Sequence, residues 1–167
     1  MTDALPMMLK DLRLPAFEQH YEAYQEQASE QAWGYGKYLS KLCEDEIARR
    51  YEVRIRNWTK EAKLPRGKSL STLAIDELPN AIQKKVIGLR DNTQWALQAD
   101  NVLLIGPSGV GKSHLASALG LHLIEQGIRV KWFSATSLVQ SLQQAKRDLD
   151  LMTVMSRLDK YRVLIID

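Results

Sequence analysis

The sequence predicts an α/β fold with a parallel sheet, preceded by a helical N-terminal domain. Through the first 62 positions, apolar side chains recur every three or four residues, as they do on one face of a helix. After residue 99, short apolar runs alternate with helical periodicity, which is typical of parallel strands joined by helical crossovers. We therefore expect a helical domain over 1–68, a linker and lead-in helix over 69–98, and an α/β domain over 99–167.

Three helices are predicted in the first range. The first carries leucines spaced by four and three residues, and Pro15 marks the first turn of a second helix that continues to about Ser29. A long helix is predicted over 37–62, because breaker residues follow it at 64–67. The residues expected on its apolar face are Tyr38, Leu42, Ile47 and Tyr51.

Three strands are predicted in the α/β range, each a short apolar run bounded by turn residues. They cover 101–105, 128–133 and 162–166. The helices expected between them cover 111–126, 135–147 and 151–159. In the linker range, the weaker pattern predicts an extended piece near 70–78 and a helix over 79–90.

The composition excludes several classes of protein. The 167-residue chain is 45% apolar and 26% charged, so it can bury a core, and its single cysteine, Cys43, excludes an intramolecular disulfide. No apolar run reaches the roughly 18 residues that cross a bilayer. Residues 1–10 lack the pattern of a secretory signal. We therefore expect a cytoplasmic protein that does not enter a membrane.

A glycine-rich sequence follows the first predicted strand. Residues 106–113 match G-x-x-x-x-G-K-[ST], whose glycines let backbone N–H groups surround a polyphosphate at the start of a helix. Lys112 is expected to bridge the β- and γ-phosphates, and the Ser113 hydroxyl to bind Mg²⁺. The alternative is a strand-to-helix turn without a ligand. The predicted cofactor-binding residues are Gly106, Pro107, Ser108, Gly109, Val110, Gly111, Lys112, Ser113 and His114.

Asp167 follows the last predicted strand. An acid at the carboxyl end of a buried parallel strand is placed to reach the Mg²⁺ held by Ser113, usually through water. The alternative is a core strand that ends in a capping aspartate.

Two interpretations remain for His114, which lies just after the start of the helix that follows the loop. It either supports the phosphate site from the second layer of residues or only packs against its neighbours.

Positive charge is concentrated in one segment. The formal net charge is +3, but residues 37–68 contain 10 basic and 5 acidic residues, whereas residues 1–36 contain 2 and 6. Trp33, Tyr51 and Trp58 lie near these cations, and the combination suits phosphate-backbone contact with stacking. The alternative is a solvated helix face. The candidate DNA contacts are Arg49, Arg50, Arg54, Arg56, Lys60 and Lys63.

Four stretches together carry a resemblance to one known family. They are Leu12-Arg13-Leu14-Pro15, Tyr38-Leu39 to Arg50, Ala62-Lys63-Leu64-Pro65 with Lys68-Ser69-Leu70, and Asn101 to Ala116. The chain resembles the IstB-like branch of the AAA+ ATPases, which are ATP-binding helper proteins of insertion sequences. It is also similar to the DnaC-type helicase loaders. The phosphate motif is generic to many NTPases, so the helical residues before it are the more specific part.

The resemblance implies a P-loop NTPase fold of the AAA+ type, with ATP and Mg²⁺ as cofactors. It also implies assembly on DNA with a transposase, and an ATP-dependent homo-oligomer of the complete protein. Family members continue after the Mg²⁺ aspartate with a catalytic acid, a sensor strand and an arginine finger. Their next strand inserts between the aspartate strand and the phosphate-loop strand. We therefore expect an incomplete sheet with unpaired edges, weaker ATP binding, and hydrolysis that is poor or absent.

Three functions are consistent with these features. The first is an ATP-binding helper protein of DNA transposition, present as a fragment that ends at the Walker B aspartate. The second is a DnaC-like replicative helicase loader, which would bind a helicase rather than a transposase. The third is an inert remnant that only binds DNA or a partner through its helices.

Overall fold

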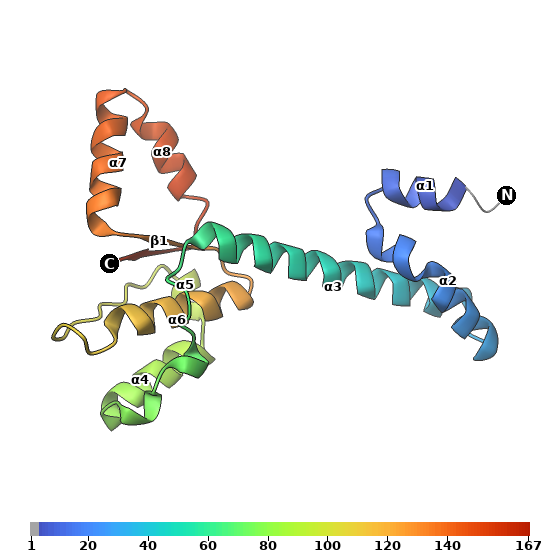
Figure 1. Ribbon diagram of the computed structural model, residues 1–167, viewed down its shortest axis with the longest axis horizontal. Helices are drawn as coiled ribbons and strands as arrows, with labels where there is room; N and C mark the ends of the chain where they lie inside the picture. The colour runs from blue at the N-terminus through green and yellow to red at the C-terminus, as the bar shows by residue number, and fades with distance from the viewer. Residues whose placement is uncertain (1–3) are drawn as a thin grey trace. The chain divides into compact units, whose positions relative to one another are not determined.

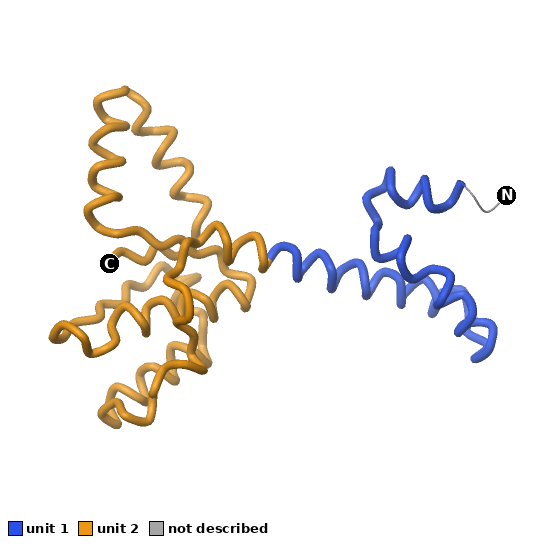
Figure 2. Tube along the Cα trace, viewed as in Figure 1, with its two compact units in different colours: residues 1–54 blue, residues 55–167 orange. Residues whose placement is uncertain are grey.

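The computed structural model describes residues 4–167, which fall into two compact units that divide between Arg54 and Ile55 (Figure 2). Helices dominate both units, and within the described residues only the second unit contains a sheet (Figure 1). Across residues 4–167, no helix combines the length and the apolar character that a bilayer crossing requires.

The first unit is built from α1 (Ala4–Asp11), α2 (Pro15–Glu30) and the first part of α3 (Tyr35–Ala62) (Figure 1). The three predicted helices are therefore confirmed, with Pro15 in the first turn of α2, where its missing N–H costs no hydrogen bond. Polar contacts join α2 to α3. The Tyr38 hydroxyl donates to the Tyr21 carbonyl at 3.1 Å, and the Tyr24 hydroxyl donates to Asp45 at 2.7 Å.

The predicted apolar face of α3 is partly wrong. Leu42 is buried as expected, but Ile47 is 69% exposed, and the neighbouring Glu46 is buried instead, with 4% of its surface exposed. The Glu46 carboxylate accepts the Ala16 amide N–H at 2.9 Å and the Arg50 Nε–H at 2.7 Å. It thereby satisfies a free N–H of the first turn of α2, which has no side-chain cap of its own.

The second unit contains the end of α3 and every later element of the chain. Its short 3-10 turns are η1 (Leu70–Thr72) and η2 (Ile75–Glu77), so the extended piece predicted near 70–78 is wrong. Serine and threonine side chains here bond the backbone of the turn instead. The remaining elements are α4 (Asn80–Asp91), α5 (Gln94–Leu97), α6 (Lys112–Glu125), β1 (Val130–Phe133), α7 (Ala135–Arg147), α8 (Leu151–Leu158) and β2 (Val163–Ile166).

The sheet consists of β1 and β2, which pair in parallel from Val130 opposite Val163 to Phe133 opposite Ile166. A parallel pair needs a long crossover, and the α7–α8 helix pair supplies it (Figure 1). The predicted order of strand, helices and strand is thereby confirmed for β1, α7, α8 and β2. In β2, however, Leu164 and Ile166 are exposed, whereas Val163 and Ile165 are partly buried, so only one face of the strand packs against the core.

Helix α6 is the centre of the second unit. On one side, Leu123 and Ile124 join a core with Val130 and with Ala62 at the end of α3. On another side, Leu115 and Leu119 pack with Val86 of α4. Because α6 is buried by neighbours along most of its length, the loop that leads into it is anchored on a fixed support.

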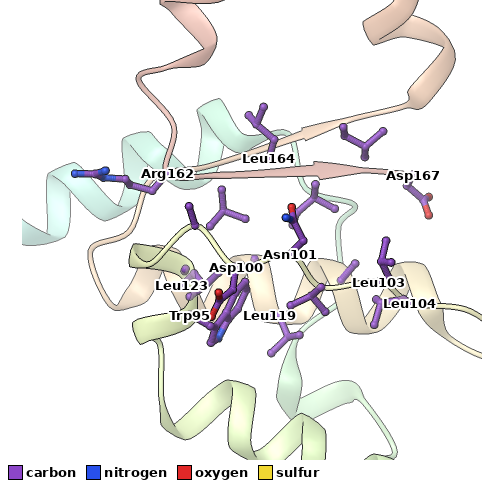
Figure 3. A pocket seen from close by; sticks show the side chains of 18 of the residues that line it. Trp95, Asp100, Asn101, Leu103, Leu104, Leu119, Leu123, Arg162, Leu164 and Asp167 are labelled. Carbon is purple, nitrogen blue, oxygen red and sulfur yellow. The ribbon is translucent and has the colours of Figure 1, made fainter.

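The strand predicted over 101–105 is not formed. Residues 101–107 have no regular structure, and Leu103 and Ile105 are 82% and 90% exposed. A strand needs a hydrogen-bonding neighbour. Here the segment lies across a cavity of about 600 Å³ from β2 (Figure 3).

The end of α3 packs within the second unit. Ala62 is fully buried there, and Ile55, Trp58 and Leu64 pack around the same core. Contacts therefore divide the chain earlier than the boundary expected between 68 and 69, because the last turns of α3 cover the sheet and α6. The three domain ranges 1–68, 69–98 and 99–167 stay a prediction.

Candidate functional site

The glycine-rich loop, residues 106–113, lies between the irregular segment 101–105 and the first turn of α6. Gly109 and Gly111 have φ values of 84° and 91°, in the left-handed region that favours glycine. Gly111 is the N-cap of α6, and its carbonyl accepts the Leu115 amide N–H at 2.8 Å. The loop therefore turns directly into the helix, whose first N–H groups have no partner within the helix.

Lys112 folds back over this loop. Its ammonium group donates to the Gly106 carbonyl at 2.9 Å and to the Pro107 carbonyl at 2.6 Å. The cation is thus held against the mouth of the loop by two of the loop's own acceptors. A phosphate bound at the loop would offer this ammonium group stronger, charged acceptors.

Ser113 and Asp167 meet although 54 residues separate them. The Ser113 hydroxyl donates to the Asp167 Oδ1 at 2.8 Å. The backbone of Asp167 is fixed on both sides, because its N–H donates to the Phe133 carbonyl at 3.0 Å and its carbonyl accepts the Ala135 N–H at 2.8 Å. The end of β1 and the start of α7 therefore position the aspartate beside the first turn of α6.

The oxygen donors of this pair fit a magnesium ion that is shared with a nucleotide. Mg²⁺ prefers hard oxygen ligands, and it binds through one or two protein groups together with phosphates and water. The hydroxyl of Ser113 and the carboxylate of Asp167 are ligands of this kind. Among residues 4–167 there is no group of three or more His, Cys, Asp or Glu side chains that could hold a metal without such help.

A cavity lies beside Lys112 and Asp167. It has a volume of about 600 Å³ and is lined by residues 99–104, by β2 and by one side of α6. Figure 3 shows Asn101, Leu103 and Leu104 on one side of this cavity and Leu164 on the other, with Asp167 at one end. Lys112 also lines it.

The ring of His114 contacts η1 and its N-cap residue. Its Nε2 lies 3.0 Å from the Thr72 Oγ1 and 3.3 Å from the Ser69 carbonyl oxygen. These contacts link α6 to η1 and to its N-cap residue, and the place of His114 among the cofactor-binding residues stays a prediction.

The structure separates the six candidate DNA contacts into different surroundings. All six side chains are exposed. Arg50 is tied to Glu46 and to the Arg13 carbonyl, and Arg54 lies over the Tyr51 ring at 5.4 Å. Lys60 and Lys63 instead line a second pocket, together with Arg66 and Lys68. Arg49, Arg50 and Arg54 belong to the first unit, and Arg56, Lys60 and Lys63 to the second.

A charged network beside the sheet was not anticipated from the sequence. Glu61 accepts two hydrogen bonds from the Arg129 NH2 group, at 2.7 and 2.8 Å, and one from the Tyr161 hydroxyl at 2.7 Å. These bonds lower the pKa of the Glu61 carboxyl, and the bond from Arg129 has the largest effect. Burial acts in the opposite direction and raises this pKa. Arg129 lies 68 positions from Glu61 in the sequence, and Tyr161 lies 100 positions from it. No local spacing could therefore have indicated these contacts.

Comparison with known proteins gives one consistent result. The family described as IstB-like ATP binding protein matches residues 7–167. A relative from Sinorhizobium fredii, named as an insertion sequence ATP-binding protein, is 42% identical over 163 residues, which cover 98% of this chain and 55% of the relative. A relative from Pseudomonas aeruginosa, whose name places it in insertion sequence IS21, is 31% identical over 98% of this chain and 61% of its own length.

A third relative carries a similar name. It comes from Geobacillus stearothermophilus, is assigned by its name to insertion sequence IS5376, and is 30% identical over 93% of this chain and 62% of its own length. The chain thus spans between about half and two thirds of the length of these relatives.

Proposed function

This chain belongs to the family of IstB-like ATP-binding proteins, and from this membership we propose that it is an ATP-binding helper protein of DNA transposition. The observation that carries the proposal is the hydrogen bond between Ser113 and Asp167. It joins the end of the glycine-rich loop to the end of β2, as a site for a nucleotide and Mg²⁺ requires.

Each part of the loop has a role in this proposal. The backbone N–H groups of 106–111 and of the first turn of α6 would bind phosphate oxygens, and Lys112 would neutralise their charge. Ser113 and Asp167 would hold Mg²⁺, which supplies positive charge to the β- and γ-phosphates when it is bound. Both Lys112 and Asp167 line the cavity beside β2, which supports their assignment to one site.

We also propose that the two strands of the second unit belong to a parallel sheet of the AAA+ type. Support comes from the parallel pairing of β1 with β2 and from the cavity that separates β2 from segment 101–105. A strand placed in this cavity would pair with the free edge of β2 and cover Leu103 and Leu164.

DNA and a transposase are the proposed partners, and an ATP-dependent homo-oligomer is the proposed assembly. The basic side chains of α3 and of the segment after it support contact with DNA, because exposed Lys and Arg side chains bind the phosphate backbone. The relatives' names refer to insertion sequences, which favours a transposition helper over a helicase loader. The proposal places the protein in the cytoplasm, where the exposed Cys43 thiol stays reduced.

Titration with a fluorescent ATP analogue, with and without Mg²⁺, tests the nucleotide part of the proposal. The chain is expected to bind in the presence of Mg²⁺, and Lys112→Ala is expected to weaken binding by about 10- to 100-fold, as loss of a charged hydrogen bond of roughly 1.5–3 kcal/mol would. Lys146→Ala, which removes an exposed lysine from α7, is the matched control. Equal and negligible affinity of wild type and Lys112→Ala would overturn the proposal.

A further inference from the structure

A second concave pocket of about 740 Å³ lies in the second unit, and no residue of the glycine-rich loop lines it. Four of its lining residues are cations, contributed by the end of α3 and by the turn that follows it. Two hydroxyl side chains at η1 and a leucine of α6 are also among the lining residues. The residues that define this basic pocket are Thr59, Lys60, Lys63, Leu64, Pro65, Arg66, Gly67, Lys68, Ser69, Thr72 and Leu121.

The positive charge of the basic pocket is not neutralised by neighbours. No acidic residue lines it, and in the described part of the chain none of its four cations forms an ion pair. Glu61, the nearest acid in sequence to Lys60, is occupied by Arg129 and Tyr161. Lys63 also acts on Lys131, whose pKa is lowered first by burial and then by the charge of Lys63.

The walls of the basic pocket are held in place by the core of the unit. Leu64 packs against the core, and the Pro65 carbonyl accepts a hydrogen bond of 3.3 Å from Ser117 of α6, whose side chain is fully buried. Gly67 has a φ of 74°, and its carbonyl accepts the Thr72 hydroxyl at 3.2 Å. The turn that carries Arg66 and Lys68 is therefore tied to both α6 and η1.

We infer that the basic pocket binds phosphate groups of a nucleic-acid backbone. This inference rests on the proposed action on DNA and names a site for it. The four cations are spread along residues 60–68, from the last turn of α3 into the turn that follows it, and three of them are exposed, so they suit a row of phosphates rather than one enclosed phosphate ion. No aromatic ring lines the basic pocket, so bases have no stacking surface and binding is independent of sequence.

The salt dependence of DNA binding tests this site. Anisotropy of a labelled duplex would be measured over a range of KCl concentrations for the full 167-residue chain without nucleotide. Lys60→Gln with Lys68→Gln removes one cation from each wall of the basic pocket. The plot of log K against log salt is expected to lose about two units of slope, with about 10- to 100-fold weaker binding near 0.1 M salt.

The matched control is Lys84→Gln with Lys85→Gln, which removes the same charge from exposed positions of α4 outside the basic pocket. It is expected to change the slope by less than one unit. Circular dichroism and the affinity for the ATP analogue should stay at wild-type values in both double variants. Equal losses of slope in the two would overturn the inference, since net charge alone would then explain the effect.

Two further outcomes separate the possible failures. If the wild type binds DNA and the Lys60/Lys68 variant keeps its full slope, this site is wrong while contact with DNA stands. If the wild type binds no DNA, both the site and DNA contact fail, whereas ATP titration still tests the nucleotide site. A competition experiment distinguishes a site for the DNA backbone from a site for free phosphate. Replacing chloride by inorganic phosphate at equal ionic strength should leave DNA binding unchanged. Displacement of DNA by low concentrations of phosphate would instead assign a site for small phosphate ions.

Discussion

The hydroxyl of Ser113 donates to the carboxylate of Asp167 at 2.8 Å, which places the first turn of α6 in contact with the carboxyl end of β2. Both residues are held from behind: α6 is buried by two clusters of apolar side chains, and the backbone of Asp167 is bonded to Phe133 and Ala135. The pair is thus built by the core of the second unit, and its proposed use with Mg²⁺ leads to the first prediction.

Asp167→Asn should remove most of the effect of Mg²⁺ on ATP binding. The amide keeps the size of the side chain but has no charge for a divalent cation, so the gain in affinity on adding Mg²⁺ should fall about tenfold or more, roughly 1.4 kcal/mol. Titrations of the ATP analogue with Mg²⁺ and with chelator measure this gain. Asp159→Asn, at the exposed C-cap of α8, is the control. An unchanged gain in the Asp167 variant would contradict the role of this carboxylate.

Glu46→Gln should destabilise the first unit. The glutamine can still accept the Ala16 N–H, but Arg50 loses its charged partner and the buried site gains an amide group that must find its own acceptor. The expected loss is about 1–3 kcal/mol of unfolding free energy, measured by urea denaturation. Glu44→Gln removes an exposed carboxylate paired with Lys41 and should cost below about 1 kcal/mol. Equal losses would show that Glu46 acts only as a surface charge.

Acid should weaken the second unit through Glu61. Hydrogen bonds from Arg129 and then Tyr161 hold its pKa below the ordinary value of 4.5. A folded-state pKa below the unfolded one adds stability at pH values above 4.5, and this contribution is lost as the pH falls through the folded-state pKa. Thermal unfolding between pH 6 and pH 3 should therefore be less pH-dependent in Glu61→Gln than in the wild type.

The exposed Glu77 of η2 provides the control for this experiment. Glu77→Gln should follow the wild-type dependence on pH, because no ion pair in the described part of the chain involves Glu77. If the two variants and the wild type lose stability in parallel, the Arg129–Glu61 bond does not contribute to the acid sensitivity.

Two glycine-to-alanine changes should have opposite effects on stability. In α4, a Cβ at Gly88 would meet no atom within 4 Å, so Gly88→Ala should raise stability by about 0.5–1 kcal/mol through helix propensity. In α6, a Cβ at Gly120 would lie 2.7 Å from the Ile165 Cδ1 and 3.1 Å from the Leu64 Cδ2. Overpacking of about 1–3 kcal/mol should then outweigh the same gain. Thermal melts of both variants measure the difference, and a stabilised Gly120→Ala would disprove close packing between α6 and β2.

Helices were the most predictable part of the fold. The ranges expected for α2, α3 and α7 agree with the structure within a few residues, because helical periodicity is a local signal, as are Pro15 at the start of α2 and Pro65 after the end of α3. The prediction of a strand over 101–105 was wrong because a strand depends on contacts that are not local. Apolar residues indicate a strand, but only a neighbouring backbone can complete its hydrogen bonds, and β2 lies across a cavity from this segment.

The sequence by itself determined the glycine-rich loop, the long α3 helix and the excess of positive charge near its end, since each depends on residues close together in the chain. Only the tertiary structure decided that Glu46 is buried beneath α2, that Glu61 pairs with Arg129, and that Lys60 and Lys68 line one pocket. These contacts join residues far apart in the sequence or on separate elements. Periodicity indicates which face of a helix or strand is buried, but the packing of the whole chain decides which distant residues contact that face.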